Sequence, residues 1–187
     1  ALFMQDQPFC RHSLSMMSLG TVQLGMKYGI SNKTGQPSLA DSFSLLSCAL
    51  SHGVNALDTS RDYGTSEDVL GQFFATIEQP PFVTTKFNIH APEGSDDAAV
   101  EQGVLTCLET SLAHLGLQKA DCLLLHNGMD MFRFEAPIMR AFRAILNHGG
   151  AELAGMSVYK PEEVDKFLSL EELSVIQVPM SVFDQKL

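Results

Sequence analysis

Four ionisable side chains stand at or just past the ends of three predicted strands: Asp58, Tyr63, Lys86 and His126. In a parallel barrel the carboxyl ends of the strands converge on one face, so residues far apart in the sequence are expected to meet in one pocket. A phenol, an ammonium, a carboxylate and an imidazole are together the groups needed to protonate a carbonyl oxygen. The pattern therefore indicates an enzyme.

These groups fit carbonyl reduction. A phenol with an ordinary pKa near ~10 is a poor acid at neutral pH. A neighbouring ammonium favours the phenolate and so eases proton donation, and a carboxylate keeps that ammonium charged. An imidazole beside the phenol can orient the substrate carbonyl. No side chain supplies hydride, so a nicotinamide cofactor is implied.

Taken singly, each residue has a plainer interpretation. Asp58 can bond backbone amides at a strand end, Tyr63 can be a half-buried aromatic, and Lys86 can be solvated. His126 can be a satisfied core residue at the end of an apolar run. Their joint occurrence at successive strand ends favours catalysis. The histidines show no metal-ligand spacing, so no metal site is predicted.

Short apolar runs bounded by turn formers alternate with amphipathic stretches, which predicts strands alternating with helices. A helix is expected after Ser38 as its N-cap, and another after a capping box formed by Thr65 and Asp68. Further helices are expected over 96–115, over 135–147 and from Pro161. The predicted strands are Leu14–Gly20, Asn55–Asp58, Phe82–Phe87, Asp121–His126, Leu153–Tyr159 and Ser174–Pro179.

The repeat recurs about every 31 residues, and eight such units need about 250 residues, the usual size of a (β/α)8 TIM barrel. The chain has 187 residues, which predicts an α/β fold with the first six βα units of such a barrel, in a single partial domain over 1–187. A doubly wound sheet is disfavoured because the stretch from Gly20 to Gly25 has the wrong spacing for a dinucleotide-binding turn.

The composition limits the partners. The formal net charge is −10, and the sequence holds no basic run that could neutralise a phosphate backbone, so nucleic acid is not expected. No apolar stretch approaches the ~20 residues that span a bilayer. The N-terminal segment 1–8 lacks the features of a signal peptide, and the four cysteines show no disulfide spacing. We therefore expect a cytoplasmic protein.

Several motifs together resemble the aldo-keto reductase family, over nearly all of 14–187. The most specific is the run from Asp58-Thr59 through Tyr63-Gly64 to Ser66-Glu67 and Leu70-Gly71. The segment 22–38 is similar to a bacterial branch of that family. The remaining matches are Leu19-Gly20-Thr21, Thr85-Lys86, Leu125-His126-Asn127, Gly155-x-Ser157 and Gln177.

The resemblance implies an NADP(H)-dependent reductase of an aldehyde or ketone, with NAD(H) as the alternative cofactor. Tyr63 would donate the proton, Lys86 and Asp58 would make the Tyr63 phenol a better proton donor, and His126 would orient the carbonyl. Ser157 and Gln177 would bind the nicotinamide carboxamide, and Gly20, Thr21 and Asp58 would also contact the cofactor. Alternatively, Ser157 and Gln177 satisfy backbone groups at the strand ends, and Gly20 forms a tight turn.

Two departures from the family pattern matter. Val158 stands where many relatives have Asn, so one carboxamide contact is lost or replaced. The seventh and eighth strands, which in the family carry further cofactor contacts, are not in this sequence. We expect either a truncated product or a fragment completed by a partner chain or a missing C-terminal segment.

Two other functions stay open. A catalytically inert barrel that acts as a binding or regulatory partner is the main alternative. An aldolase-like barrel with Lys86 as a Schiff-base nucleophile is the other, but it leaves Asp58 and Tyr63 without a natural role.

Overall fold

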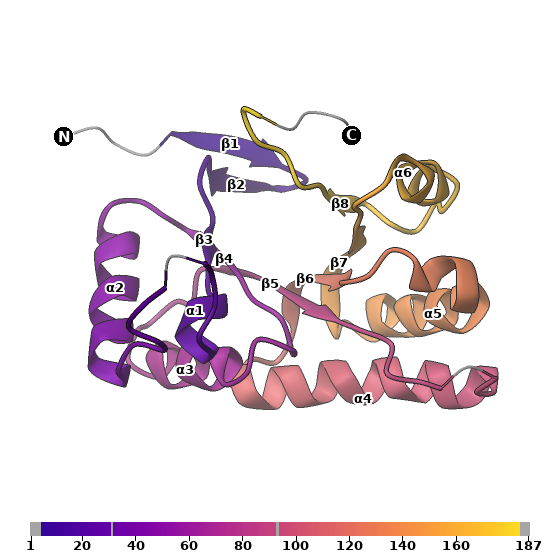
Figure 1. The fold of residues 1–187 in the computed structure, drawn as a ribbon, viewed down its shortest axis with the longest axis horizontal. Helices are drawn as coiled ribbons and strands as arrows, with labels where there is room; N and C mark the ends of the chain where they lie inside the picture. The colour runs from indigo at the N-terminus through magenta and orange to yellow at the C-terminus, as the bar shows by residue number, and fades with distance from the viewer. Residues whose placement is uncertain (1–4, 31, 93, 184–187) are drawn as a thin grey trace. The chain divides into compact units, whose positions relative to one another are not determined.

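The computed structural model describes residues 5–30, 32–92 and 94–183, so residues 1–4 of the N-terminal segment considered above lie outside the described residues. Three strands and two helices come first, and from residue 56 onward strands and helices alternate along the chain (Figure 1). The elements are β1 Asp6–Phe9, β2 His12–Ser15, β3 Leu19–Gly20, α1 Val22–Gly25, α2 Leu39–Ser51, β4 Ala56–Asp58, α3 Ser66–Phe74, β5 Phe82–Phe87, α4 Asp97–Leu115, β6 Ala120–Leu125, α5 Asp130–Asn147, β7 Ala151–Ser157, α6 Pro161–Leu168 and β8 Val175–Gln177.

The chain divides into two compact units. Unit 1 comprises residues 1–84 and 113–117, and unit 2 comprises residues 85–112 and 118–187. The boundary falls within β5 and again near the end of α4, so each unit holds part of both elements. The single-domain organisation expected from the sequence stays a prediction.

In unit 1, β1 and β2 form an antiparallel hairpin, and β3, β4 and the first half of β5 pair in parallel. Gly20 is level with Asp58, and Asp58 is level with Thr84. Apolar side chains of α1, α2 and α3 pack with those of the strands in one core that includes Leu46, Leu57 and Leu70, each 0% exposed.

In unit 2, β7 pairs in parallel with β6 on one side and β8 on the other, and the register places Ser157 level with Gln177. The core contains the apolar faces of α4 and α5, with Ile138 and Phe142 both 0% exposed. Phe142 contacts Phe87 of β5 edge to face, at 5.7 Å between ring centroids.

The strand order of the larger sheet is β3-β4-β5-β6-β7-β8, which follows the chain order without reversal. A doubly wound sheet reverses its order at a switch point, whereas a barrel adds each parallel strand beside the previous one. The fold is therefore the predicted one, a partial (β/α)8 barrel with six parallel strands.

Three predicted helix starts agree with the structure. The Ser38 hydroxyl accepts from the Asp41 amide (3.1 Å), Asp96 Oδ1 accepts from the Ala99 amide (2.7 Å), and Pro161 is the first residue of α6. The helix predicted over 135–147 begins earlier, at Asp130, because a helical turn precedes a kink at Phe134 (φ −137°, ψ 35°).

Two local predictions were wrong. Leu14–Gly20 is not one strand, because residues up to Ser15 belong to the hairpin strand β2 and β3 begins only at Leu19. The Thr65 side chain makes no capping bond; its hydroxyl instead donates to the Gly25 carbonyl (3.3 Å) and accepts from the Gln36 amide (2.9 Å).

Candidate active site

The structure places the predicted site residues at carboxyl ends of parallel strands. Gly20 ends β3, Asp58 ends β4, Ser157 ends β7 and Gln177 ends β8. The others lie nearby: Thr21 follows β3, Tyr63 is on the loop after β4, Lys86 is the last residue but one of β5, and His126 follows β6. This edge carries the active site in characterised barrels of this kind. The individual roles stay predictions.

The predicted residues are divided between the two units. Gly20, Thr21, Asp58 and Tyr63 belong to unit 1, and Lys86, His126, Ser157 and Gln177 belong to unit 2.

Thr21 and Asp58 are joined in unit 1. The Asp58 carbonyl accepts from both the Thr21 amide (3.0 Å) and the Thr21 hydroxyl (2.9 Å). Thr21 is 0% exposed. These two bonds hold the end of β3 beside the end of β4, and so fix Gly20 level with Asp58.

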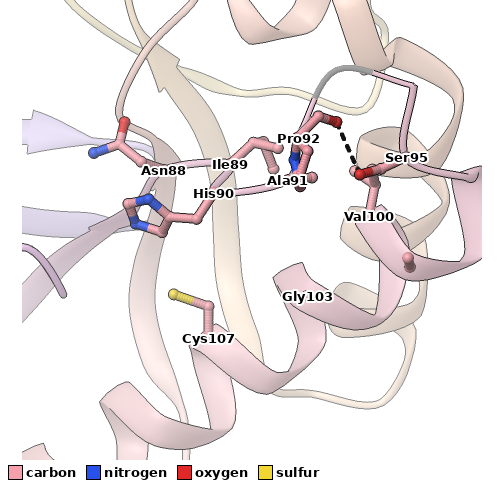
Figure 2. Close-up of a pocket in the computed structure, with 10 residues that line it drawn as sticks. Asn88, Ile89, His90, Ala91, Pro92, Ser95, Val100, Gly103 and Cys107 are labelled. Atoms are coloured by element: carbon pink, nitrogen blue, oxygen red, sulfur yellow. Dashed lines mark hydrogen bonds between the residues drawn. The ribbon is translucent and has the colours of Figure 1, made fainter.

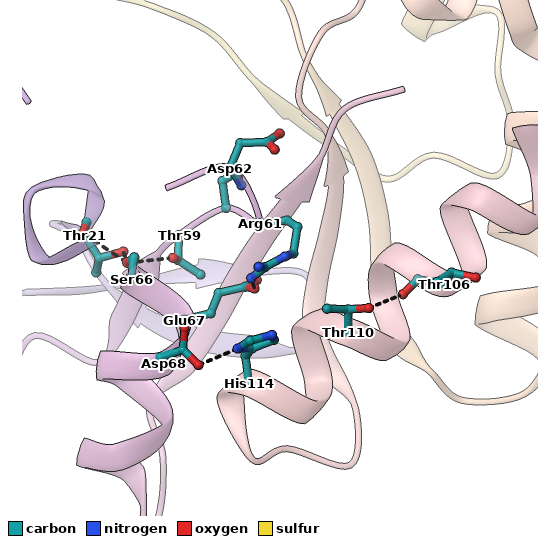
Figure 3. Close-up of polar contacts among 11 residues, drawn as sticks. Thr21, Thr59, Arg61, Asp62, Ser66, Glu67, Asp68, Thr106, Thr110 and His114 are labelled. Carbon is teal, nitrogen blue, oxygen red and sulfur yellow. Dashed lines mark hydrogen bonds and ion pairs between the residues drawn. The ribbon is translucent and has the colours of Figure 1, made fainter. Parts of the chain in front are cut away.

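A buried chain of hydroxyl groups extends this junction (Figure 3). The Ser66 hydroxyl lies 2.9 Å from the Thr21 hydroxyl and 3.0 Å from the Thr59 hydroxyl. The Thr21 proton goes to the Asp58 carbonyl, and the single Ser66 proton goes to Thr21, whose hydroxyl and carbonyl oxygens (the latter at 3.0 Å) both lie within reach. Ser66 therefore accepts from Thr59. Successive donors and acceptors of this kind strengthen one another in a buried setting.

Tyr63 lies on the loop between these two anchoring residues, Thr59 and Ser66. Its amide donates to the Ser60 carbonyl (3.1 Å), and its carbonyl accepts from the Ser66 amide (3.0 Å). The Arg61 guanidinium pairs with the Glu67 carboxylate across the same loop, Nη1 to Oε2 at 2.8 Å. The backbone that carries the phenol is therefore held at both ends.

Gly25 packs directly against the same loop. A Cβ atom at Gly25 would lie 1.8 Å from the Tyr63 carbonyl oxygen and 2.3 Å from the Ser66 nitrogen. Gly64 has φ +57°, where a side chain is strained, and a Cβ there would lie 2.4 Å from the Gly25 oxygen. Sequence reasoning missed this contact, because a glycine at the end of a short helix gives no local sign of the residues that it packs against.

Lys86 in unit 2 is 1% exposed and is among the largest fully buried side chains. An ammonium withdrawn from water is stable only where other groups compensate its charge or bond its protons.

His126 follows the last residue of β6, and its amide donates to the Phe87 carbonyl at 2.8 Å. The Asn88 side-chain nitrogen lies 3.5 Å from His126 Nδ1. With Asn88 as the donor, Nδ1 must accept, so the neutral ring carries its proton on Nε2. That tautomer can donate a hydrogen bond to a carbonyl oxygen.

Ser157 and Gln177 are joined as their strand register predicts. The Ser157 hydroxyl donates to the Gln177 side-chain oxygen at 3.1 Å. Val158, the residue that departs from the family pattern, is 0% exposed, and its amide donates to the Gln177 carbonyl (2.9 Å). Val158 therefore binds through its backbone and packs its side chain in the interior.

Glu163 fixes the loop that follows Ser157, a role that sequence reasoning missed. The carboxylate is 1% exposed and accepts from the amides of Tyr159 and Lys160, the latter at 3.1 Å. The acidic first turn of α6 was visible in the sequence, but which amides it would bind was not.

Asp130 is a further buried carboxylate, 4% exposed, at the first residue of α5. Burial raises the pKa of Asp130, while the nearby Arg133 guanidinium and the Ile89 amide oppose that rise. Arg133 Nη1 lies 3.2 Å from Asp130 Oδ1.

Among the residues that the structure describes, no group of three or more His, Cys, Asp or Glu is arranged to hold a metal ion.

Parallel strands in sequential order, with polar and ionisable residues at their carboxyl ends, define a partial (β/α)8 barrel. The sequence profile of the Aldo/keto reductase family matches residues 16–187. The chain therefore belongs to the aldo-keto reductase family.

Solved bacterial structures have the same fold. A Pseudomonas aeruginosa protein assigned to the aldo-keto reductases superposes with a TM-score of 0.78 at 23% identity, covering 96% of this chain and 69% of its own. A Bacillus halodurans aldo-keto reductase in its holo form gives 0.75 at 19%, covering 95% and 58%. A Gluconobacter oxydans glycerol dehydrogenase gives 0.69 at 25%, covering 97% and 56%. The chain thus spans little more than half the length of the last two.

No curated protein sequence matches this chain at a significant level. Within residues 5–30, 32–92 and 94–183, no helix is long and apolar enough to cross a membrane.

Proposed function

We propose that this chain is the acid–base part of an NADP(H)-dependent reductase that converts an aldehyde or ketone to an alcohol, acting in the cytoplasm. The proposal rests on one observation in a member of the aldo-keto reductase family: Asp58, Lys86 and His126 lie at or beside the ends of successive parallel strands. Tyr63 lies on the loop that follows β4. Cofactors of this class supply a hydride to the carbonyl carbon.

The proton would come from Tyr63. As the carbonyl oxygen gains charge, the phenol transfers its proton to that oxygen and the O–H bond of the tyrosine breaks, leaving a phenolate. Lys86, buried as an ammonium, would stabilise that phenolate, and Asp58 would keep the ammonium charged. His126, protonated on Nε2, would donate to the same oxygen and align it.

The residues at the strand ends fit a nicotinamide cofactor. Ser157 and Gln177 form a joined pair with amide and hydroxyl groups of the kind that bind a carboxamide. A Cβ atom at Gly20 would meet nothing within 4 Å, so open space adjoins this backbone, as a cradle for a cofactor requires. Thr21 and Asp58 complete the proposed contacts.

The neighbours suggest which cofactor and substrate to test first. A Klebsiella pneumoniae aldo/keto reductase was solved in complex with NADP and acetate, and the Gluconobacter protein is a glycerol dehydrogenase. We therefore propose NADP(H) before NAD(H), and a small carbonyl compound or the matching alcohol as substrate.

The decisive variant is Tyr63→Phe, which removes the proton donor and little else. We expect turnover of a carbonyl substrate with NADPH to be lost while NADPH affinity, followed by cofactor fluorescence, stays the same. Tyr28→Phe makes the same chemical change on an exposed loop and should keep full turnover. Retained turnover in Tyr63→Phe would remove Tyr63 as the acid.

A titration of the 187-residue chain with NADPH separates this function from its alternative, an inert barrel that acts as a binding or regulatory partner. Saturable binding supports the reductase. A chain that binds no NADPH at millimolar concentration supports the alternative.

A further inference from the structure

A pocket of about 320 Å³ lies in unit 2, between the loop that follows β5 and the first half of α4 (Figure 2). The loop contributes residues that follow the strand directly, and the helix contributes one face over two turns. The lining residues are Asn88, Ile89, His90, Ala91, Pro92, Ser95, Ala99, Val100, Gly103 and Cys107.

The lining has a polar end and an apolar end. Figure 2 shows Asn88, His90 and Cys107 toward one side of the pocket, and Pro92 and Val100 toward the other. The Ser95 hydroxyl donates to the Pro92 carbonyl (2.8 Å), so this hydroxyl is used to shape the loop. Gly103 contributes no side chain, and a Cβ atom there would meet nothing within 4 Å.

Charge and size define what the pocket can hold. None of the described lining residues is Asp, Glu, Lys or Arg, in a chain whose net charge is −10, so neither a Lys nor an Arg lines the pocket to pair with an anion. Small-molecule sites are typically apolar concavities with a few polar groups. A dry cavity of ~150 Å³ holds one benzene molecule, so this pocket has room for one ring with a substituent.

We propose that this pocket binds a small neutral molecule made of one ring and one hydroxyl or carbonyl group. The ring lies against Ile89, Ala91 and Val100, and the polar group faces Asn88 and His90. This site is separate from the proposed cofactor and proton-donor residues, and it does not depend on the proposed function.

The pocket is coupled to His126 through one side chain. Asn88 lines the pocket, and its amide nitrogen lies 3.5 Å from His126 Nδ1. A ligand that bonds the Asn88 amide therefore competes with His126 for that amide or reorients it. The same amide sets the tautomer of His126. Occupancy is expected to change the environment of the His126 ring.

Benzyl alcohol is a suitable probe, with benzoate as its charged counterpart. In a titration of the ¹⁵N-labelled 187-residue chain, benzyl alcohol should shift the amide signals of Ala91, Val100 and Gly103 saturably, together with the His126 ring signals. At pH 8, benzoate should bind more weakly by about tenfold or more, because no Lys or Arg lines the pocket to compensate the charge that it would bring out of water.

Gly103→Leu fills the pocket and should weaken benzyl alcohol binding by about tenfold or more. Gln102→Leu adds the same side chain to the preceding residue of α4, which does not line the pocket, and should leave binding unchanged. Shifts that map elsewhere, absence of saturable shifts, or equal affinity in Gly103→Leu would overturn the proposal. If Gly103→Leu does not fold, the shift map of the unaltered chain and the benzoate comparison decide it.

Discussion

Arg61 and Glu67 form an ion pair across the loop that carries Tyr63, with Glu67 1% exposed and Arg61 28% exposed. The two sides of this pair respond differently to substitution. Removing Arg61 leaves a buried carboxylate without one of its partners, which is costly. Neutralising Glu67 leaves a guanidinium that water can still reach.

We therefore expect Arg61→Ala to lower the free energy of unfolding by about 2–3 kcal/mol, and Glu67→Gln to lower it less. Urea denaturation of both variants measures the difference. Arg143→Ala is the matched control, because its pair with Glu172 is exposed and worth at most about 1 kcal/mol. A larger loss in Glu67→Gln than in Arg61→Ala would contradict this assignment.

The hydroxyl chain through Ser66 provides a second prediction. Ser66→Ala removes the central member, so the buried hydroxyls of Thr21 and Thr59 each lose a partner. We expect a loss of about 1–3 kcal/mol in the free energy of unfolding. Ser44→Ala, on the exposed face of α2, should change it by no more than about 0.5 kcal/mol. Equal effects of the two variants would show that the hydroxyl chain contributes little.

The ends of β3, β4 and β5 and the first helix cap could be predicted from the sequence because their signals are local, whereas β6, β7 and β8 end one or two residues earlier than predicted. A serine three residues before an acidic side chain, and apolar runs that end in polar residues, depend on neighbours within one turn or strand. The same locality explains the error at β1 and β2. Their turn contains Cys10 at φ +50°, a conformation that usually signals glycine or asparagine, so the sequence carried no turn signal there.

The remaining features depend on contacts between distant residues. The Thr65 hydroxyl bonds Gly25, 40 residues away, and so is diverted from capping α3. Asp68, its predicted partner, instead pairs with the imidazole of His114. Nothing within a local window distinguishes these outcomes from a capping box. The packing of Gly25 on Tyr63 was invisible for the same reason.

That packing provides a third prediction. In Gly25→Ala the new methyl group would overlap the Tyr63 carbonyl oxygen, at 1.8 Å. Because the overlapped atoms belong to the backbone, no side chain can rotate away to relieve the clash. We expect a loss of about 3 kcal/mol or more in the free energy of unfolding. A Gly25→Ala variant that unfolds at the wild-type urea concentration would contradict the close approach.

Gly20→Ala tests the other glycine of the same segment. A methyl group there meets nothing within 4 Å, so the free energy of unfolding should change by no more than about 0.5 kcal/mol. If the Gly20 backbone approaches the cofactor as proposed, NADPH affinity should nevertheless fall. Unchanged affinity in a fully folded variant would remove Gly20 from the cofactor site.

The pH dependence of stability should report on Asp130. Burial raises the pKa of this carboxyl above its ordinary value of 3.8, so the folded state binds the proton more tightly than the unfolded state. The stability that protonated Asp130 contributes is present in full below the ordinary pKa. It is lost as the pH rises through the raised folded pKa.

Asp130→Asn removes this titration while keeping an oxygen that can accept from the Ile89 amide. Relative to wild type, the variant should therefore gain stability as the pH rises from about 3 to about 7, by about 1.4 kcal/mol for each unit by which the pKa is raised. Urea denaturation across that range measures it. Arg133→Gln removes a cation that lowers the pKa of Asp130, so its stability should fall more steeply with rising pH than that of wild type. If plots of the free energy of unfolding against pH stay parallel for Asp130→Asn and wild type, Asp130 titrates alike in the folded and unfolded states.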